Sequence, residues 1–147
     1  MLPWISGPEK VDVLDLVLVD DVGRIVNPLT LHGQVEGAAV QGLGGVLSEE
    51  ISYDENGQLL VASLADYMIP LATDVPHLTA ISLEEHPSPN NPLGVKGAGE
   101  GGIIPIGGAI AGAVASALSS LGVEPNVLPL TPQRVWQLIE DARAKLG

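Results

Sequence analysis

Residues 29–51 read LTLHGQVEGAAVQGLGGVLSEEI, and this stretch decides the fold expected for the chain. Apolar and small residues recur in it at steps of three and four, which is the spacing of one face of an α-helix. They are Val35, Ala38, Ala39, Gly42, Val46 and Leu47. The stretch also holds five glycines, and each glycine inside a helix costs up to about 1 kcal/mol relative to alanine. We therefore predict a helix over residues 29–51 whose backbone lies very close to a neighbouring segment.

The segments around this helix predict both strands and further helices. The Asn56-Gly57 pair is typical of a hairpin turn, and Thr131 followed by Pro132 is typical of a helix start. The expected elements are a strand over 11–25, a hairpin over 51–62, a strand over 78–83, an apolar helix over 105–121 and a last helix over 131–145. The predicted fold class is α+β, with mixed strands, a β-hairpin and three helices in a single domain over residues 1–147.

The charge of the chain excludes two classes of partner. Its 147 residues include 18 acidic and 6 basic side chains, which give a formal net charge of −12. Such a chain repels the phosphates of nucleic acids and anionic membrane surfaces, so we expect neither as a partner. The absence of cysteine excludes disulfides and thiolate ligands for zinc or an Fe–S cluster within this chain.

The composition indicates a folded chain with an unusual core. Apolar residues make up 46% of the sequence and charged residues 16%, which favours a packed core over disorder. The aromatic residues are only Trp4, Tyr53, Tyr67 and Trp136. Because aromatic rings usually supply much of the buried area, this core must be built from Val, Leu, Ile and Ala. We expect such a chain to be part of something larger.

One segment requires a test for membrane insertion. Residues 101–123 contain no charged side chain and are long enough to span a bilayer. Pro105 lies near their start, and Glu100 and Glu124 flank them without any lysine or arginine to set an orientation. We therefore predict a buried core helix. Residues 1–8 show no secretory signal, which indicates a cytoplasmic location.

The acidic and histidine residues predict no metal site within the chain. His32, His77 and His86 are widely separated in sequence. Asp20 and Asp21 are adjacent on a predicted strand, so their side chains point to opposite faces.

Residues 91–102 read NPLGVKGAGEGG and form the most unusual segment. Its glycines let backbone amides converge on a ligand, and Lys96 adds a charge suited to a phosphate or another anion. Gly97, Gly99 and Gly102 match the spacing of a dinucleotide fingerprint. However, the segment follows a proline-rich loop, and we expect no parallel strand–helix–strand unit around it. A Rossmann site is therefore rejected.

Glu100, in the same segment, has two possible roles. A carboxylate in an apolar pocket has a raised pKa and can act as a general base near neutral pH. The alternative is a favourable acid in the first turn of the apolar helix.

Gln34 and Gln41 lie two helical turns apart and therefore on one side of the predicted helix. Their amides suit recognition of a heterocycle or a polar cofactor. The alternative is a small-residue helix interface in which the glutamines bind nearby backbone groups.

Several motifs occur in one order along the chain. They are VDDVGRIVNP at 19–28, GQVEGAAVQGLG at 33–44, NPLG at 91–94, KGAGE at 96–100 and LPLTP at 128–132. Together they resemble the molybdenum hydroxylases, the family of xanthine dehydrogenase, aldehyde oxidase and the large subunit of aerobic carbon monoxide dehydrogenase. The resemblance covers nearly the whole chain, and it is to the C-terminal part of the molybdopterin-binding subunit.

This resemblance implies roles for particular residues. Glu100 matches the active-site base beside molybdenum, and Gln34 matches a glutamine that hydrogen-bonds the pterin cofactor. Asp21, Lys96, Gly97 and Gly99 fall in segments that line the cofactor. In bacterial members the cofactor is typically molybdopterin cytosine dinucleotide, which agrees with a glycine-rich cradle for a pyrophosphate.

The chain departs from the family in length, because the catalytic subunits are several times longer. The resemblance therefore implies a cofactor shared with missing protein segments, and partners that include the rest of the molybdopterin-binding subunit and Fe–S and FAD subunits. The expected function is oxidation of a small-molecule substrate: an aldehyde, an N-heterocycle or carbon monoxide. The alternative is a non-catalytic domain or fragment that acts only in self-association or subunit assembly.

Overall fold

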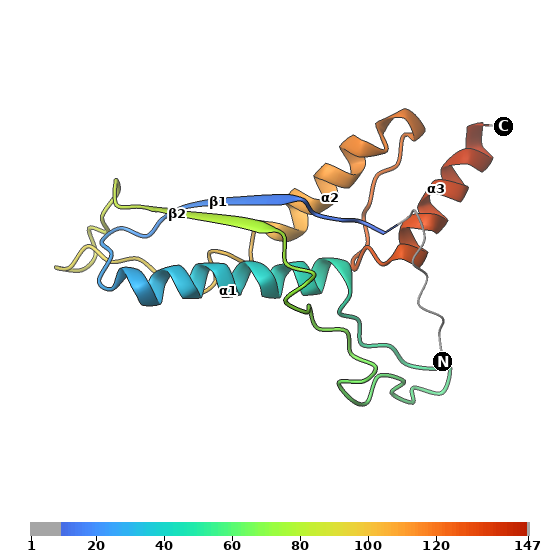
Figure 1. Ribbon diagram of the computed structural model, residues 1–147, viewed down its shortest axis with the longest axis horizontal. Coiled ribbons are helices and arrows are strands. Elements are labelled where there is room, and N and C mark those ends of the chain that lie inside the picture. The colour runs from blue at the N-terminus through green and yellow to red at the C-terminus, as the bar shows by residue number, and fades with distance from the viewer. Residues whose placement is uncertain (1–9, 147) are drawn as a thin grey trace. The chain divides into compact units, whose positions relative to one another are not determined.

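The computed structural model describes residues 10–146 and contains both strands and helices (Figure 1). The expectation for residues 1–8 lies outside the described residues. The elements are β1 (Asp15–Asp21), α1 (Pro28–Leu47), β2 (His77–Leu83), α2 (Ile106–Ala117), the short 3-10 helix η1 (Ser119–Leu121) and α3 (Pro132–Leu146). The predicted α+β class, with its three helices, is confirmed.

Two compact units divide the chain. Among the described residues, unit 1 contains residues 10–12, 44–69 and 107–146, and unit 2 contains residues 13–43 and 70–106. Most of α1 and both strands therefore belong to unit 2, whereas most of α2 and all of α3 belong to unit 1.

The two strands of unit 2 pair in parallel, with Asp15 opposite His77 and Asp21 opposite Leu83. Strands that pair in parallel need a crossover, and α1 lies in the connection between them. A parallel strand–helix–strand unit thus precedes residues 91–102, the glycine-rich segment. This is contrary to our expectation. The rejection of a Rossmann site still has support, because the glycines follow β2 only after a loop that begins at Glu84.

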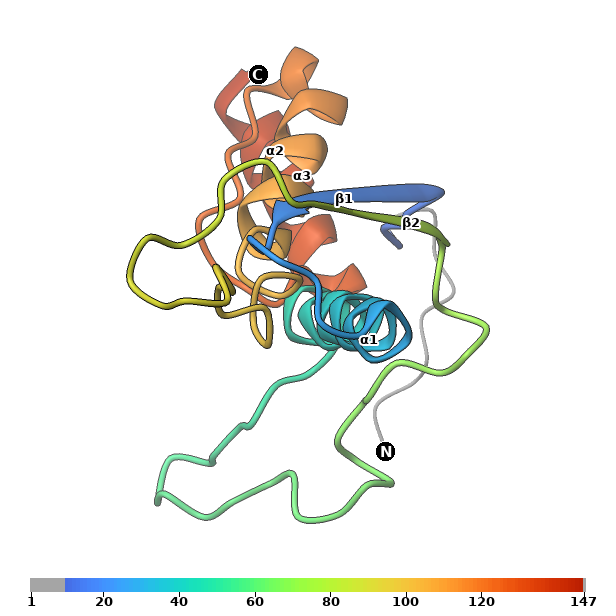
Figure 2. The same cartoon turned by 90° about the vertical axis from the view of Figure 1, so that its left-hand side faces the viewer.

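One face of β1 is buried, and α1 runs alongside the parallel pair. Leu16 and Leu18 of β1 are buried, whereas Val17 and Val19 between them are more than half exposed. Figures 1 and 2 both show α1 running along one side of the two strands. The buried residues of α1 within unit 2 are Val35, Ala38, Ala39, Gly42 and Leu43. The predicted apolar face of this helix is therefore confirmed.

Local chemistry sets the two ends of α1. The side-chain oxygen of Asn27 accepts the backbone N–H of Thr30 at 3.2 Å, and Pro28 occupies the first helical position. The backbone N–H groups of Ser48 and Glu49 both donate to the carbonyl oxygen of Gly44, which closes the last turn. The helix ends before Glu49 and Glu50, where negative charges at a helix C-terminus are unfavourable.

Unit 1 contains the predicted last helix together with its cap. The Thr131 hydroxyl oxygen accepts the backbone N–H of Arg134 at 3.3 Å, and the guanidinium of Arg134 donates to the carbonyl oxygen of Pro129. The helix predicted over 105–121 is divided, because α2 ends at Ala117 and η1 follows. Within residues 10–146, no helix has both the length and the hydropathy needed to cross a membrane.

The predicted hairpin of unit 1 is present in a short form, in which the N–H groups of Asp54 and Leu60 donate to the carbonyl oxygens of Gln58 and Ser52, each at 2.9 Å. Tyr53 and Leu59 form one antiparallel bridge around the Asp54–Gly57 turn. Beyond this bridge, the side chains of Leu60 and Leu64 are more than half exposed. The segment therefore gains little stabilisation from packing within unit 1.

Candidate functional site

The glycine-rich segment is attached by its backbone to the end of β1. The Lys96 N–H donates to the carbonyl oxygen of Val22 at 2.9 Å, and the Arg24 N–H donates to that of Gly94 at 3.1 Å. Gly23 and Val95 form an antiparallel bridge between these two bonds. Because each bond joins residues far apart in sequence, they fix where the segment begins within unit 2.

Asp21 reinforces the same junction through its side chain. One carboxylate oxygen accepts the backbone N–H of Gly23 and the Lys96 ammonium, each at 3.0 Å. The other oxygen accepts the backbone N–H of His86 at 2.9 Å and lies 3.0 Å from its ring nitrogen Nδ1. The Gly23 amide, together with Lys96 and His86, lowers the pKa of Asp21 well below its usual value, although burial acts in the opposite direction. Both carboxylate oxygens are therefore engaged by donors from this chain.

This pKa shift predicts how stability depends on pH. Because the pKa of Asp21 is lower in the folded chain, the unfolded chain binds its proton more tightly. The ionised carboxylate therefore stabilises the fold above the ordinary value of 3.8, and this contribution is lost as the pH falls below it. We expect the free energy of unfolding to fall more steeply with acidification in the wild type than in Asp21→Asn. Urea unfolding at several pH values measures both slopes, and equal slopes would contradict the prediction.

Gln34 joins α1 to the glycine-rich segment. Its side-chain Nε2 donates to the carbonyl oxygen of Gly99 at 2.8 Å. This contact is what the alternative interpretation of the glutamines predicts, since the amide binds a nearby backbone group. It also places the Gln34 amide beside the peptide group that joins Gly99 to Glu100.

Glu100 lies in a turn that precedes α2. Its carbonyl oxygen accepts the N–H groups of Ile103 and Ile104 at 3.1 and 3.3 Å, and α2 begins only at Ile106. The first turn of α2 contains no acidic residue, so the interpretation of Glu100 as a first-turn acid is wrong. The Glu100 side chain is exposed, and within residues 10–146 no hydrogen bond or ion pair engages its carboxylate. The apolar pocket expected around it is not formed by the described residues.

A pocket of about 410 Å³ lies beside these residues, entirely within unit 2. Gln34, Lys96 and Gly99 line it, and Glu100 follows Gly99 directly. The other lining residues are Val22, Arg24, Ile25, Val26, Asn27, Thr30, Leu31, Val95 and Ala98. Three of the residues singled out from the sequence thus meet at one concave surface.

Asp21 and Gly97 do not line this pocket, and they differ in what surrounds them. Asp21 is held by the donors described above. Gly97 is exposed, and a Cβ added there, or at Gly99, would meet no atom within 4 Å. A ligand can therefore approach the backbone at both glycines.

The sequence analysis did not single out Arg24, although it lines the pocket. The available signal was its place near the end of the strand predicted over 11–25, in a chain with only 6 basic residues. A basic side chain at the end of a parallel strand is well placed to reach a ligand, because ligand sites lie at the carboxyl ends of such strands.

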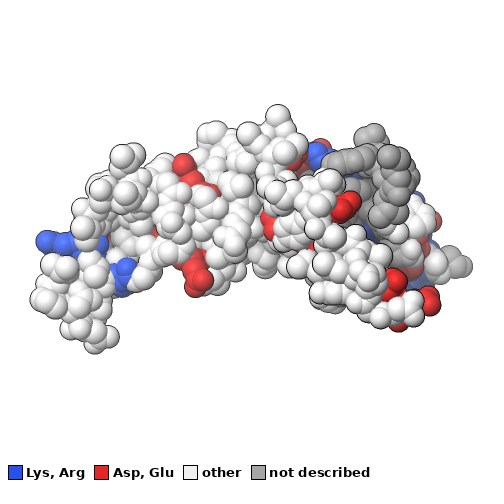
Figure 3. All heavy atoms as spheres, turned by 90° about the horizontal axis from the view of Figure 1, so that it is seen from below, with Lys and Arg blue, Asp and Glu red and all other residues white. Residues whose placement is uncertain are grey.

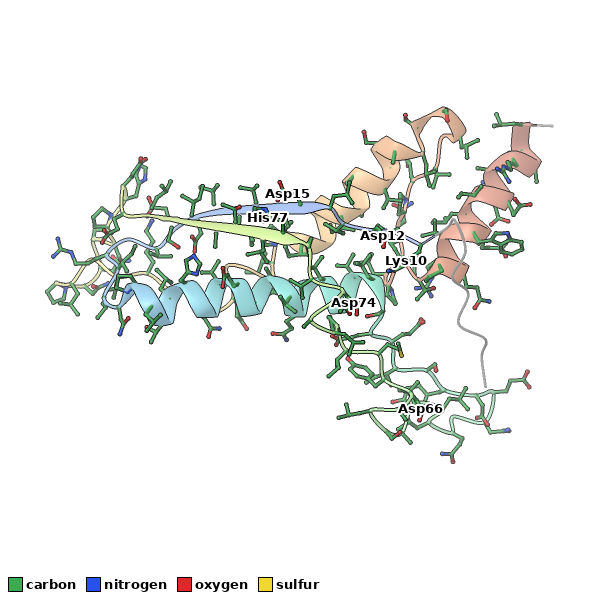
Figure 4. All side chains as sticks on the ribbon, in the orientation of Figure 1. Lys10, Asp12, Asp15, Asp66, Asp74 and His77 are labelled. Atoms are coloured by element: carbon green, nitrogen blue, oxygen red, sulfur yellow. The ribbon has the colours of Figure 1, made fainter. Side chains whose placement is uncertain are left out.

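The histidines make pairwise contacts only. His77 lies 3.1 Å from Asp15 at the start of the two strands, as Figure 4 shows, and His32 lies 3.3 Å from Glu36. In the described part of the chain, no three side chains of the metal-binding types gather at one place.

Comparisons with known proteins agree with this arrangement. A family model described as the molybdopterin cofactor-binding domain matches residues 8–76. Over 116 residues the chain is 47% identical to the 6-hydroxypseudooxynicotine dehydrogenase complex subunit gamma of Paenarthrobacter nicotinovorans. Over 129 residues it is 33% identical to the carbon monoxide dehydrogenase large chain of Hydrogenophaga pseudoflava. These alignments cover 79% and 84% of this chain, respectively.

The fold is also found in a solved structure. Quinoline 2-oxidoreductase from Pseudomonas putida 86 superposes with a TM-score of 0.81 and 40% identity over 85% of this chain. The chain thus matches one segment of the molybdopterin-binding subunits of these proteins. It belongs to the molybdenum hydroxylase family, as the sequence motifs predicted. It spans only 14%, 15% and 16% of the length of these three proteins.

Proposed function

We propose that this chain forms part of a molybdenum-dependent hydroxylase and contributes its active-site base, Glu100. The observation that carries the proposal is the hydrogen bond from Gln34 to the carbonyl oxygen of Gly99. It holds the Gln34 amide against the peptide group that joins Gly99 to Glu100, and both Gln34 and Gly99 line the pocket. Within residues 10–146 the Glu100 carboxylate has no partner. In this proposal Gln34, Lys96, Gly97 and Gly99 contact the cofactor, and Asp21 contributes to the same site by holding Lys96.

The residues present fit such a cofactor. Gln34 offers amide groups of the kind that hydrogen-bond a pterin, and the open space at Gly97 and Gly99 admits a ligand to their backbone N–H groups. When bound, the molybdenum cofactor supplies the redox chemistry of the reaction. We propose the cytosine dinucleotide form, whose pyrophosphate suits a glycine-rich segment with a nearby lysine.

In this proposal the chain's own residues move a proton and orient the ligand. Glu100 accepts a proton at its carboxylate, which no hydrogen bond from the described part of the chain occupies. Gln34 holds the peptide group that precedes Glu100 and thereby limits where the carboxylate can reach. The substrate class is an aldehyde, an N-heterocycle or carbon monoxide.

Most of the site must come from other protein segments, because the chain spans about a seventh of its relatives' length. We propose that these segments complete the molybdopterin-binding subunit, and that Fe–S and FAD subunits accept the electrons. One of the relatives is named as a subunit of a dehydrogenase complex, which supports an assembly of this kind. A cytoplasmic location is part of the same proposal.

Analysis of the protein from its native source tests the proposal. We expect molybdenum at about one atom per copy of this sequence, together with a pterin and partner subunits identified by mass spectrometry. A folded native preparation that contains neither molybdenum nor pterin would contradict the proposal. It would leave the non-catalytic assembly role as the explanation.

A further inference from the structure

The pocket described above has a charge opposite to that of the chain. The whole sequence carries a net charge of −12, yet none of the pocket's lining residues is an aspartate or a glutamate. Two of them, Arg24 and Lys96, are basic. Figure 3 shows acidic and basic atoms at several places on the mostly uncharged face that it draws.

The charge of Arg24 is not compensated within the described residues. Lys96 lies 3.0 Å from the carboxylate of Asp21. The other two arginines are also paired, Arg134 with Glu50 at 3.1 Å and Arg143 with Glu140 at 2.8 Å. In contrast, no carboxylate within residues 10–146 forms an ion pair with the guanidinium of Arg24. A strongly acidic chain has thus left an arginine unpaired beside a pocket.

The start of α1 adds to the positive potential of the pocket. Asn27, Thr30 and Gln34 line one side of it, and the first turn of α1 contains no acidic residue. The N-terminus of a helix carries a partial positive charge, which favours an anion there. Ile25, Val26 and Leu31 supply apolar surface in the same pocket. The combination fits a ligand that has an anionic group attached to an organic body.

We propose that Arg24 is the anion-binding residue of this pocket and that the anion is a phosphate group of an organic ligand. The planar guanidinium matches a phosphate with two parallel hydrogen bonds, and a lysine at the same position would act only as a point charge. One source of this phosphate is the molybdenum cofactor, and in that case the inference rests on the proposed function. The other source is a free phosphorylated small molecule.

Pyrophosphate binding to the cofactor-free chain, measured by isothermal titration calorimetry, tests the proposal. We expect saturable binding to the wild type, and binding weakened by about tenfold to a hundredfold in Arg24→Gln, as for loss of hydrogen bonds to a charged group. Arg24→Lys should recover part of the affinity. Arg143→Gln is the matched control, since Arg143 does not line the pocket, and it should bind as the wild type does.

Two results would overturn the proposal. One is the absence of pyrophosphate binding to the folded wild type, and the other is equal binding by the wild type and Arg24→Gln. Circular dichroism and urea unfolding show whether each variant is folded. We expect no large change in stability, because the Arg24 side chain is exposed and forms no ion pair with any described residue.

A second measurement separates the two sources of phosphate. If the cofactor occupies the pocket, pyrophosphate should no longer bind to the cofactor-loaded native enzyme, and Arg24→Gln should retain less molybdenum. If the loaded enzyme still binds pyrophosphate through Arg24, the ligand is a free phosphorylated molecule. A native enzyme without molybdenum whose pyrophosphate binding still depends on Arg24 would contradict the proposed function alone. An active, molybdenum-containing Arg24→Gln enzyme with unchanged pyrophosphate affinity would contradict this inference alone.

Discussion

Glu100→Gln is expected to lower turnover of the complete native enzyme by about 10²- to 10⁴-fold, the range typical for loss of a general base. The glutamine has nearly the same shape but cannot accept a proton. Because no partner among residues 10–146 binds the Glu100 carboxylate, the substitution should leave the fold unchanged. Molybdenum and pterin contents should also equal those of the wild type, so the loss should appear in kcat. Steady-state kinetics and metal analysis on one preparation measure both quantities.

Glu124→Gln provides a matched control for this experiment. Glu124 is also exposed and unpaired within the described residues, it follows η1 in sequence, and it is not among the residues that line the pocket. It should retain wild-type turnover. Wild-type kcat in Glu100→Gln, with a full complement of cofactor, would remove Glu100 from the role of base. Loss of cofactor together with activity would assign it a binding role instead.

Local sequence was sufficient to predict the elements whose ends are set by nearby residues. The predicted start of α3 at Thr131-Pro132 is confirmed. It could be predicted because the threonine hydroxyl and the N–H that it caps are only three residues apart. The strand predicted over 78–83 is confirmed within one residue as β2. The helix predicted over 29–51 is confirmed as α1 over most of its length.

Contacts between distant residues could not be read from these local patterns. The parallel register of β1 and β2 depends on how the chain returns after α1, which alternation of residues within one strand does not specify. The carboxylate of Asp21 is held by Lys96 and His86, which are 75 and 65 positions away. A sequence motif could place Asp21 near the cofactor segment, but the bonds that hold the segment became visible only in the structure.

The glycines show how far an argument from composition extends. We predicted a close neighbour for the backbone of the long helix, and this is confirmed at Gly42, where an added Cβ would lie 2.8 Å from an Ile106 side-chain carbon. The prediction of a close neighbour is wrong for Gly33 and Gly37, where an added Cβ would meet nothing within 4 Å in the described chain. Glycine content therefore predicted one close contact but not which residue makes it.

Gly102→Ala is expected to lower the free energy of unfolding by about 1–3 kcal/mol, the usual cost of overpacking. An added Cβ would collide with the carbonyl oxygen of Val35 and would lie 3.0 Å from the Cβ of Ala38. Backbone atoms of α1 cannot move aside as a flexible side chain can, so the glycine-rich segment must shift away from the helix. Urea unfolding of the chain measures the loss of stability.

Gly101→Ala is the control, because its Cβ would make only an ordinary contact of 3.7 Å with an oxygen of Asp20. Its stability should stay within about 0.5 kcal/mol of the wild type. If the Gly102 contact also positions the site, Gly102→Ala should lengthen the hydrogen bond between Gln34 and Gly99 and lower turnover, whereas Gly101→Ala should not. Equal stability of the two variants would show that α1 and the segment are not held in close contact. The structure would then no longer support the placement of Gln34 near Glu100, because the contact of Gly102 with α1 also holds the glycine-rich segment against that helix.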